Sequence, residues 1–278
     1  MIRIQYVRFI PVTRLLFVSV LLIFTVCPHL YSYSNGSNQN SCKSYESSES
    51  DPLIRYAGNH AFLTVSKISD HTFSIILFPL ESIHSSEPEL PESEFVAEHE
   101  KEQIWRSRTV MDPIRGSVGD YTLEILRSPL RIVFRHPDDS ILQELLWPDS
   151  DDGRLEMRAK EKIYGLLRIG QTGDGSWDVI NNEAGSDGSM FSPPAGDPFV
   201  LHGENGWTLF IAHPAGSTSS FTLDGEKGTF LPDAQRLTSP VQIFITLRKE
   251  PEKILNEYSL FAAPSLLKLL QSSGIESL

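Results

Sequence analysis

Apolar and polar residues alternate with a period of two along much of the chain, most clearly in residues 121–136 (YTLEILRSPLRIVFRH). Because successive side chains of a strand point to opposite faces, this pattern predicts two half-buried antiparallel strands. Ser128 and Pro129 form the expected turn between them. The apolar positions are Tyr121, Leu123 and Ile125 in the first strand, and Leu130, Ile132 and Phe134 in the second.

Residues 199–231 (FVLHGENGWTLFIAHPAGSTSSFTLDGEKGTFL) are short apolar runs separated by turn-forming residues. The separating clusters contain Gly with Asn, Asp or Pro, which is typical of tight turns between strands. Residues 207–212 (WTLFIA) are apolar on both faces and predict a central strand that is covered on both sides. Further strands are expected at residues 61–68, 73–77, 141–147, 155–157, 163–169 and 241–247. Together these elements predict a mainly β protein built as an antiparallel β-sandwich.

Residues 251–262 carry the one clear helical pattern. Pro251 suits the first helical turn, and apolar residues recur at helical spacing as far as Ala262. Two other segments predict exposed loops. Residues 81–103 are acidic and contain two prolines, and residues 170–197 are rich in Gly, Asp, Ser and Pro. A loop of more than about 15 residues in a compact domain is usually functional or disordered.

The N-terminus has the character of an export signal. Three arginines precede an uncharged apolar run at residues 15–26, which is short for a transmembrane helix. We therefore expect an exported protein, periplasmic or extracellular. The alternative is an uncleaved anchor through residues 9–33, which would be the chain's attachment to a membrane. The expected divisions are a signal peptide (1–34), a flexible Ser/Asn-rich tether (35–52), the sandwich domain (53–264) and a tail (265–278).

The net charge and the cysteine count limit the kinds of partner and site that we expect. The formal net charge is -12, whereas nucleic acids and anionic membrane surfaces favour faces rich in Lys and Arg, so neither is expected as a partner. Export leaves Cys42 as the only cysteine of the mature chain, so an internal disulfide and a cysteine-based metal cluster are both excluded. No metal and no cofactor are predicted.

The motifs name no catalytic residue. Residues 185–189 (GSDGS) do not fit a nucleophile elbow, and Lys160 stands where a calcium loop starting at Asp149 needs a carboxylate. His202 and His213 flank the predicted central hairpin. Two histidines without a third ligand are more often hydrogen-bonded or surface groups than metal ligands. No two carboxyl groups stand in a recognisable pair of the kind that glycoside hydrolysis uses.

Several segments in order resemble the N-terminal region of glycoside hydrolase family 31, the α-glucosidase and α-xylosidase family. Residues 121–134 are similar to its early strand pair, and residues 162–166 (KIYGL) resemble the start of its YGLGE segment. Residues 198–231 resemble its "PF…GW.LF…P.G" strand pair with the following "G..G.F", and residues 241–258 its strand-helix unit. The similarity covers residues 62–264. The family's Gly-Glu is missing, because residues 167–171 (LRIGQ) stand there.

In that family this region is a β-sandwich of the galactose-mutarotase type. It packs on a (β/α)₈ barrel that carries an aspartate nucleophile and an aspartate acid/base, and it extends a loop to the rim of the active site. By position, the resemblance implies a substrate-binding loop formed by Trp177, Asp178, Asn181 and Asn182. An aromatic ring packs against the C–H face of a sugar, while carboxylate and amide groups bind its hydroxyls.

The barrel has no counterpart here, because 14 residues follow Pro264 and a barrel needs about 250. We therefore expect the non-catalytic sandwich of a family 31 α-glycosidase, from a truncated or frameshifted gene or as a stand-alone relic, with an α-glycoside as ligand. Two alternatives stay open. One is a module that docks on a separately encoded barrel through residues 251–261 and the tail. The other is a mutarotase-like epimerase, suggested by fold analogy alone.

Overall fold

The computed structural model describes residues 53–81, 90, 93–127, 129–165, 169–171, 177–179, 182–183, 190–191, 199–212 and 219–271. Between residues 165 and 191 the description is limited to the backbone of short strands. All described residues belong to one compact unit, Glu49–Leu278. The predicted signal peptide (1–34) and the predicted tether (35–52) lie outside the described residues.

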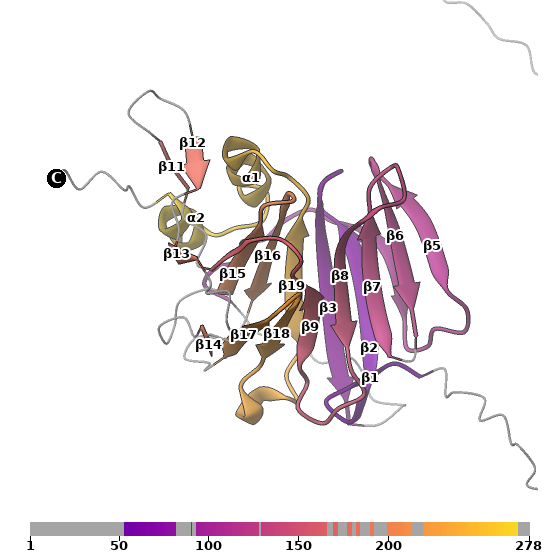
Figure 1. Cartoon of the computed structure of the whole chain (residues 1–278). Helices are drawn as coiled ribbons and strands as arrows, with labels where there is room; N and C mark the ends of the chain where they lie inside the picture. The colour runs from indigo at the N-terminus through magenta and orange to yellow at the C-terminus, as the bar shows by residue number, and fades with distance from the viewer. Residues whose placement is uncertain are drawn as a thin grey trace, which may run out of the picture. The chain divides into compact units, whose positions relative to one another are not determined.

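The larger sheet has nine antiparallel strands in the order β1-β2-β3-β19-β16-β15-β10-β13, with β4 paired to β2 off this path (Figure 1). The strands β16 and β19 lie at its centre, and every residue of β16 is buried. The bounds are β1 (Arg55–Tyr56), β2 (Asn59–Lys67), β3 (Thr72–Leu80), β4 (Glu102–Ser107), β10 (Ile163–Gly165), β13 (Asn182–Glu183), β15 (Phe199–Gly203), β16 (Trp207–Ala212) and β19 (Val241–Thr246).

The second sheet has eight antiparallel strands in the order β14-β17-β18-β9-β8-β7-β6-β5. A separate two-stranded ribbon is formed by β11 (Ile169–Gln171) and β12 (Trp177–Val179). The bounds of the eight are β5 (Ile114–Val118), β6 (Tyr121–Leu126), β7 (Leu130–Arg135), β8 (Ile141–Trp147), β9 (Leu155–Arg158), β14 (Met190–Phe191), β17 (Ser220–Asp224) and β18 (Lys227–Leu231).

The main core lies between the two sheets. Because side chains alternate along a strand, the apolar residues spaced two apart all face this core. One cluster of buried residues contains side chains from both sheets. Aromatic pairs join the layers: the rings of Phe73 and Phe134 lie 5.4 Å apart, and those of Phe199 and Phe230 lie 4.8 Å apart. The two sheets thus share one apolar core.

A second apolar layer covers the opposite face of the larger sheet. Helices α1 (Pro251–Tyr258) and α2 (Pro264–Leu270) pack there against β15, β16 and β19. The rings of Phe244 and Phe261 stack at 4.2 Å with an interplanar angle of 4°, and the ring of Phe210 stacks beside them. Neither helix has a side-chain cap at its N-terminus, and the buried residues of both, among them Ile254 and Leu266, belong to this apolar layer.

The predicted fold class, a mainly β antiparallel sandwich, is confirmed, including the doubly covered strand at residues 207–212. The structure adds α2, the edge strand β5 and the strand β4, whose first two residues lie in the segment expected as an exposed loop (81–103). The segment expected as a long loop, residues 170–197, contains the short strands β12, β13 and β14. None of the described helices is long and apolar enough to cross a membrane.

Candidate functional site

The predicted sugar-binding residues fall on two short strands. Trp177 and Asp178 begin β12, opposite Gln171 and Gly170 of β11, and this ribbon lies beside α1 (Figure 1). Asn182 begins β13, where its backbone lies opposite Gly165 of β10. These strands fix the backbone positions of three of the four residues. Asn181 lies outside the described residues.

The strand β10 carries a polar cluster next to Asn182. Ile163 points inward and is 1% exposed, so Lys162 and Tyr164 on either side of it project to the other face. The Tyr164 hydroxyl donates a hydrogen bond of 2.7 Å to the Glu204 Oε1 atom. The Lys162 Nζ atom lies 5.1 Å from the centre of the Tyr164 ring. An aromatic ring, a carboxylate and an ammonium group therefore meet at this edge of the sheet.

The ring of Tyr164 rests on a buried histidine. His202, in the neighbouring strand β15, stacks on it with ring centres 6.1 Å apart and an interplanar angle of 23°. The His202 Nδ1 atom lies 3.1 Å from the Thr208 hydroxyl. Burial lowers the pKa of His202 to about 4, so the imidazole is neutral near pH 7. The hydrogen bond to Glu204 raises the pKa of Tyr164 and keeps its hydroxyl protonated.

A second contact fixes the hairpin behind this cluster. The indole nitrogen of Trp207 donates a hydrogen bond to the Glu161 carboxylate across Gly203. A Cβ atom on Gly203 would lie only 2.4 Å from the indole, so the position has no room for a side chain. The close approach of indole and backbone locks the register of β15 and β16 beside Tyr164.

The same face of the sheet is joined to α1 by a carboxylate. Thr72 donates a hydrogen bond of 2.8 Å to Glu257 Oε2, and Ser69 donates another to the same oxygen. The Thr72 hydroxyl also lies 3.0 Å from the Thr246 hydroxyl of β19. The ribbon of β11 and β12 lies beside this helix.

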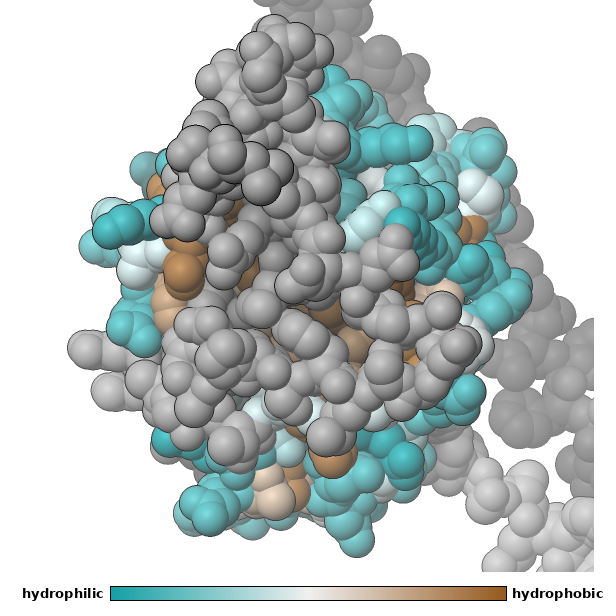
Figure 2. Space-filling model, turned by 60° about the vertical axis from the view of Figure 1, so that its left-hand side comes forward, coloured by the Kyte–Doolittle hydropathy of each residue, from teal (hydrophilic) through white to brown (hydrophobic). Residues whose placement is uncertain are grey.

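Figure 2 turns this side of the molecule toward the viewer. Among the described residues seen there, hydrophilic side chains predominate and apolar ones form small patches.

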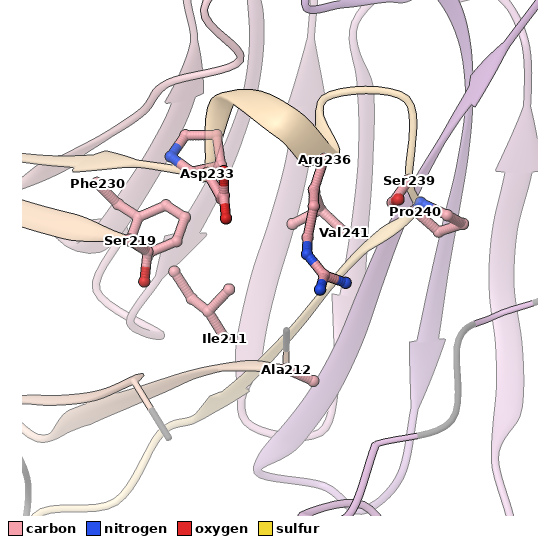
Figure 3. A pocket seen from close by; sticks show the side chains of 10 residues that line it. Ile211, Ala212, Ser219, Phe230, Asp233, Arg236, Ser239, Pro240 and Val241 are labelled. Carbon is pink, nitrogen blue, oxygen red and sulfur yellow. The ribbon is translucent and has the colours of Figure 1, made fainter. Parts of the chain in front are cut away.

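Two hollows elsewhere fit a sugar less well. A crevice of about 30 Å³ opens between the ends of the sheets, bordered by Phe230, Val241 and Arg236 (Figure 3). It has room for one water molecule, and the buried Ser219 hydroxyl there has no hydrogen-bond partner. An open groove of about 450 Å³ crosses the outer face of the smaller sheet. Two ion pairs are formed by its lining residues, Lys227 with Glu156 and Lys160 with Glu226, each at 2.9 Å.

In the described part of the chain, no three His, Cys, Asp or Glu side chains gather as a metal site. His202 is 4% exposed and hydrogen-bonded to Thr208, so it packs as a core residue. His213, the other candidate, lies outside the described residues. Sequence reasoning missed Tyr164, Lys162 and Glu204 as a group. The alternation Lys-Ile-Tyr could have placed the first two on one face, whereas Glu204 joins them only through the pairing of β10 with β15.

Among known proteins, solved enzymes share the fold of part of this chain. No protein-family model matches the chain, and no curated protein matches it. A glycoside hydrolase family 31 dextranase from Flavobacterium johnsoniae, solved with isomaltotriose and with glucose, superposes with a TM-score of 0.52 at 11% identity. The match covers 74% of this chain and 26% of the dextranase, so this chain spans about a quarter of that enzyme's length.

Two other solved enzymes match less closely. The cycloalternan-forming enzyme of Listeria monocytogenes has 17% identity and a TM-score of 0.42, over 71% of this chain and 19% of the enzyme. A family 31 sulfoquinovosidase from E. rectale has 14% identity and a TM-score of 0.22, over 68% of this chain and 33% of the enzyme. The dextranase match supports a fold related to family 31 enzymes.

Proposed function

We propose that this chain is a non-catalytic, carbohydrate-binding β-sandwich of the kind that forms the N-terminal part of family 31 α-glycosidases. The observation that carries the proposal is the dextranase match, which covers most of this chain and a quarter of the enzyme. In such an enzyme the sandwich would border an active site supplied by a (β/α)₈ barrel. The ligand would be an α-glycoside, and the chain itself would not hydrolyse it.

The proposed binding surface is the edge formed by β10, β13 and the β11–β12 ribbon. Tyr164 and Trp177 would supply aromatic faces for sugar C–H groups, and Glu204, Asp178 and Asn182 would bind hydroxyls. Tyr164 is suited to this role because His202 supports its ring and Glu204 holds its hydroxyl. A ring that is already held in place loses little conformational entropy when a sugar packs against it.

Titration of the purified chain with isomaltotriose tests the proposal, with binding followed by calorimetry or NMR. Trp177→Ala and Tyr164→Ala should each weaken binding about tenfold or more, which corresponds to about 1.4 kcal/mol. Tyr164→Phe keeps the ring and is the matched control, so it should retain most of the affinity. Unchanged affinity in both alanine variants would remove this edge as the binding surface. Hydrolysis of an aryl α-glucoside by the wild-type chain would contradict the non-catalytic assignment.

Docking onto a separate barrel is the second candidate, and the exposed Leu260 at the end of α1 favours it. Its side chain is 47% exposed. Ile254, Tyr258 and Phe261 of the same segment are buried in the domain's own core. A contact made by this segment would therefore be largely polar around Leu260. Co-purification with a barrel protein that Leu260→Asp abolishes would support docking, and co-purification unaffected by that variant would exclude this contact.

Export is also a proposal, and the leader of residues 1–34 supports it. Mass spectrometry of the N-terminus of the protein recovered from its host would test it directly. A mature chain beginning near residue 35 in the periplasm or the medium is the expected result. A full-length chain in the cytosol would refute export, and a full-length chain in the membrane fraction would indicate the anchor instead.

A further inference from the structure

The strand β5 ends the smaller sheet with one open edge. It pairs with β6 alone, and Figure 1 shows its other edge facing away from the sheet. Arg115, Gly116 and Ser117 at its centre are exposed, and a Cβ atom on Gly116 would meet nothing within 4 Å. Among the residues that the structure describes, none forms a ladder with this edge.

The turn that joins β5 to β6 determines which backbone groups face outward. It has two residues, Gly119 with φ +58° and Asp120, and it closes on the pair Val118 and Tyr121. The closing pair of such a hairpin exchanges hydrogen bonds, and the pairs of an antiparallel ladder then alternate. The N–H and C=O groups of Arg115 and Ser117 therefore point away from β6, toward the open edge.

This edge is complementary to itself. If a second copy of β5 pairs antiparallel with Gly116 on the two-fold axis, Arg115 lies opposite Ser117 of the second copy, and Ser117 opposite its Arg115. Each of these two pairs exchanges two backbone hydrogen bonds. On the inner face, Ile114 lies opposite Val118 of the second copy, so the apolar row continues across the axis. The two copies of Arg115 are diagonal neighbours across the axis rather than directly opposite, and each is paired with Asp139 of its own molecule.

Edge strands normally carry features that prevent such pairing. The other edges have them: β1, β13 and β14 have only two residues each, and the pairing of β4 with β2 is interrupted by a register shift. The strand β5 has five residues and contains neither proline nor a register shift. Its one charged side chain, Arg115, is engaged by Asp139 of the same molecule.

We propose that β5 is a homodimerisation edge, at which a second copy of this chain pairs through β5 and joins the two smaller sheets. The contact is short, since a five-residue strand buries much less than the roughly 800 Å² per partner of a standard interface. Each copy also carries a net charge of -12, and the copies therefore repel each other. The dimer is accordingly weak, and salt strengthens it by screening this repulsion.

Sedimentation velocity of the purified chain over a concentration series, at low and high salt, tests the proposal. Ser117→Pro removes an N–H that makes no bond to β6, so it should leave the fold intact and raise the dimer dissociation constant about tenfold or more. Ser117→Ala keeps the N–H and is the matched control that should dimerise like the wild type. Circular dichroism and thermal melting confirm that both variants are folded.

Two results would overturn the proposal. One is a wild-type chain that remains monomeric at every soluble concentration in high salt. The other is an association that Ser117→Pro leaves unchanged, which would place the contact elsewhere. A folding defect in Ser117→Pro would be bypassed by Gly116→Asp, which sets two carboxylates against each other at the two-fold axis and should also abolish the dimer.

Discussion

Protonation of His202 should control the acid stability of this domain. The ring is 4% exposed and stacks under Tyr164, and burial lowers its pKa from 6.5 to about 4. In the unfolded chain the imidazole is accessible and titrates near 6.5. Between pH 6.5 and pH 4 the unfolded state therefore binds more protons than the folded state.

The sign and size of the effect follow from this difference. Stability rises with pH wherever the unfolded state binds more protons, so the contribution of His202 is fully present above pH 6.5 and is lost as the pH falls toward 4. A difference of about 2.5 pKa units corresponds to about 3 kcal/mol in total, of which about 2 kcal/mol is lost between pH 7 and pH 5.

Urea unfolding of the wild type and of His202→Asn at pH 7 and pH 5 measures this contribution. The variant has no titrating ring, so its free energy of unfolding should fall by about 2 kcal/mol less than that of the wild type over this interval. Thr208→Val keeps the imidazole buried and is the matched control. It should be less stable at both pH values and keep most of the wild-type pH dependence.

The difference in pH dependence between the wild type and His202→Asn isolates the contribution of His202. Other groups that titrate in this range, such as His71, whose pKa is also lowered by burial and by the nearby Arg248, contribute equally to the wild type and to His202→Asn. They cancel in the difference between the two proteins. Identical pH dependence in the two proteins would show that His202 becomes protonated in the folded state as easily as in the unfolded chain, and that the ring is not buried as described.

Three further changes probe the packing. Gly203→Ala should cost about 1–3 kcal/mol in urea unfolding, because the added Cβ atom would lie 2.4 Å from the Trp207 indole; an unaffected stability would contradict that contact. Glu257→Ala should cost about 1–3 kcal/mol and speed amide exchange in α1, since two hydroxyls lose their acceptor, and unchanged exchange would show that this carboxylate does not hold the helix. Phe261→Ala should cost about 3–5 kcal/mol because its ring is fully buried, whereas Leu260→Ala, at a 47% exposed neighbour, should cost less than about 1 kcal/mol; similar losses would refute the aromatic stack.

The strands could be predicted because their signal is local. Within each strand of residues 121–134 the apolar positions of one face recur every two residues, and the structure buries Leu123, Ile125 and Ile132 in this way. The helix α1 has an equally local signal in Pro251 and its apolar stripe. The helix α2 was missed although Pro264 suits its first turn and the buried Leu266 and Leu270 stand four residues apart, because residues 265–278 were expected as a tail.

The candidate site could be predicted only in part. The resemblance directed attention to residues 177–182, and the structure gives backbone positions to Trp177, Asp178 and Asn182. Nothing local in the sequence joins Tyr164 to Glu204, because they are separated by 40 residues and meet only when β10 pairs with β15.

By itself, the order of apolar and polar residues determined that this chain forms strands, which face of most strands is buried and where the tight turns fall, because each of these depends on neighbours a few residues apart. The tertiary structure alone decided that β5 lies at an open edge, that His202 is buried beneath Tyr164 and that Glu257 joins α1 to the sheet. Those features depend on which strands become neighbours, and strand order follows from the packing of the whole domain rather than from any single segment.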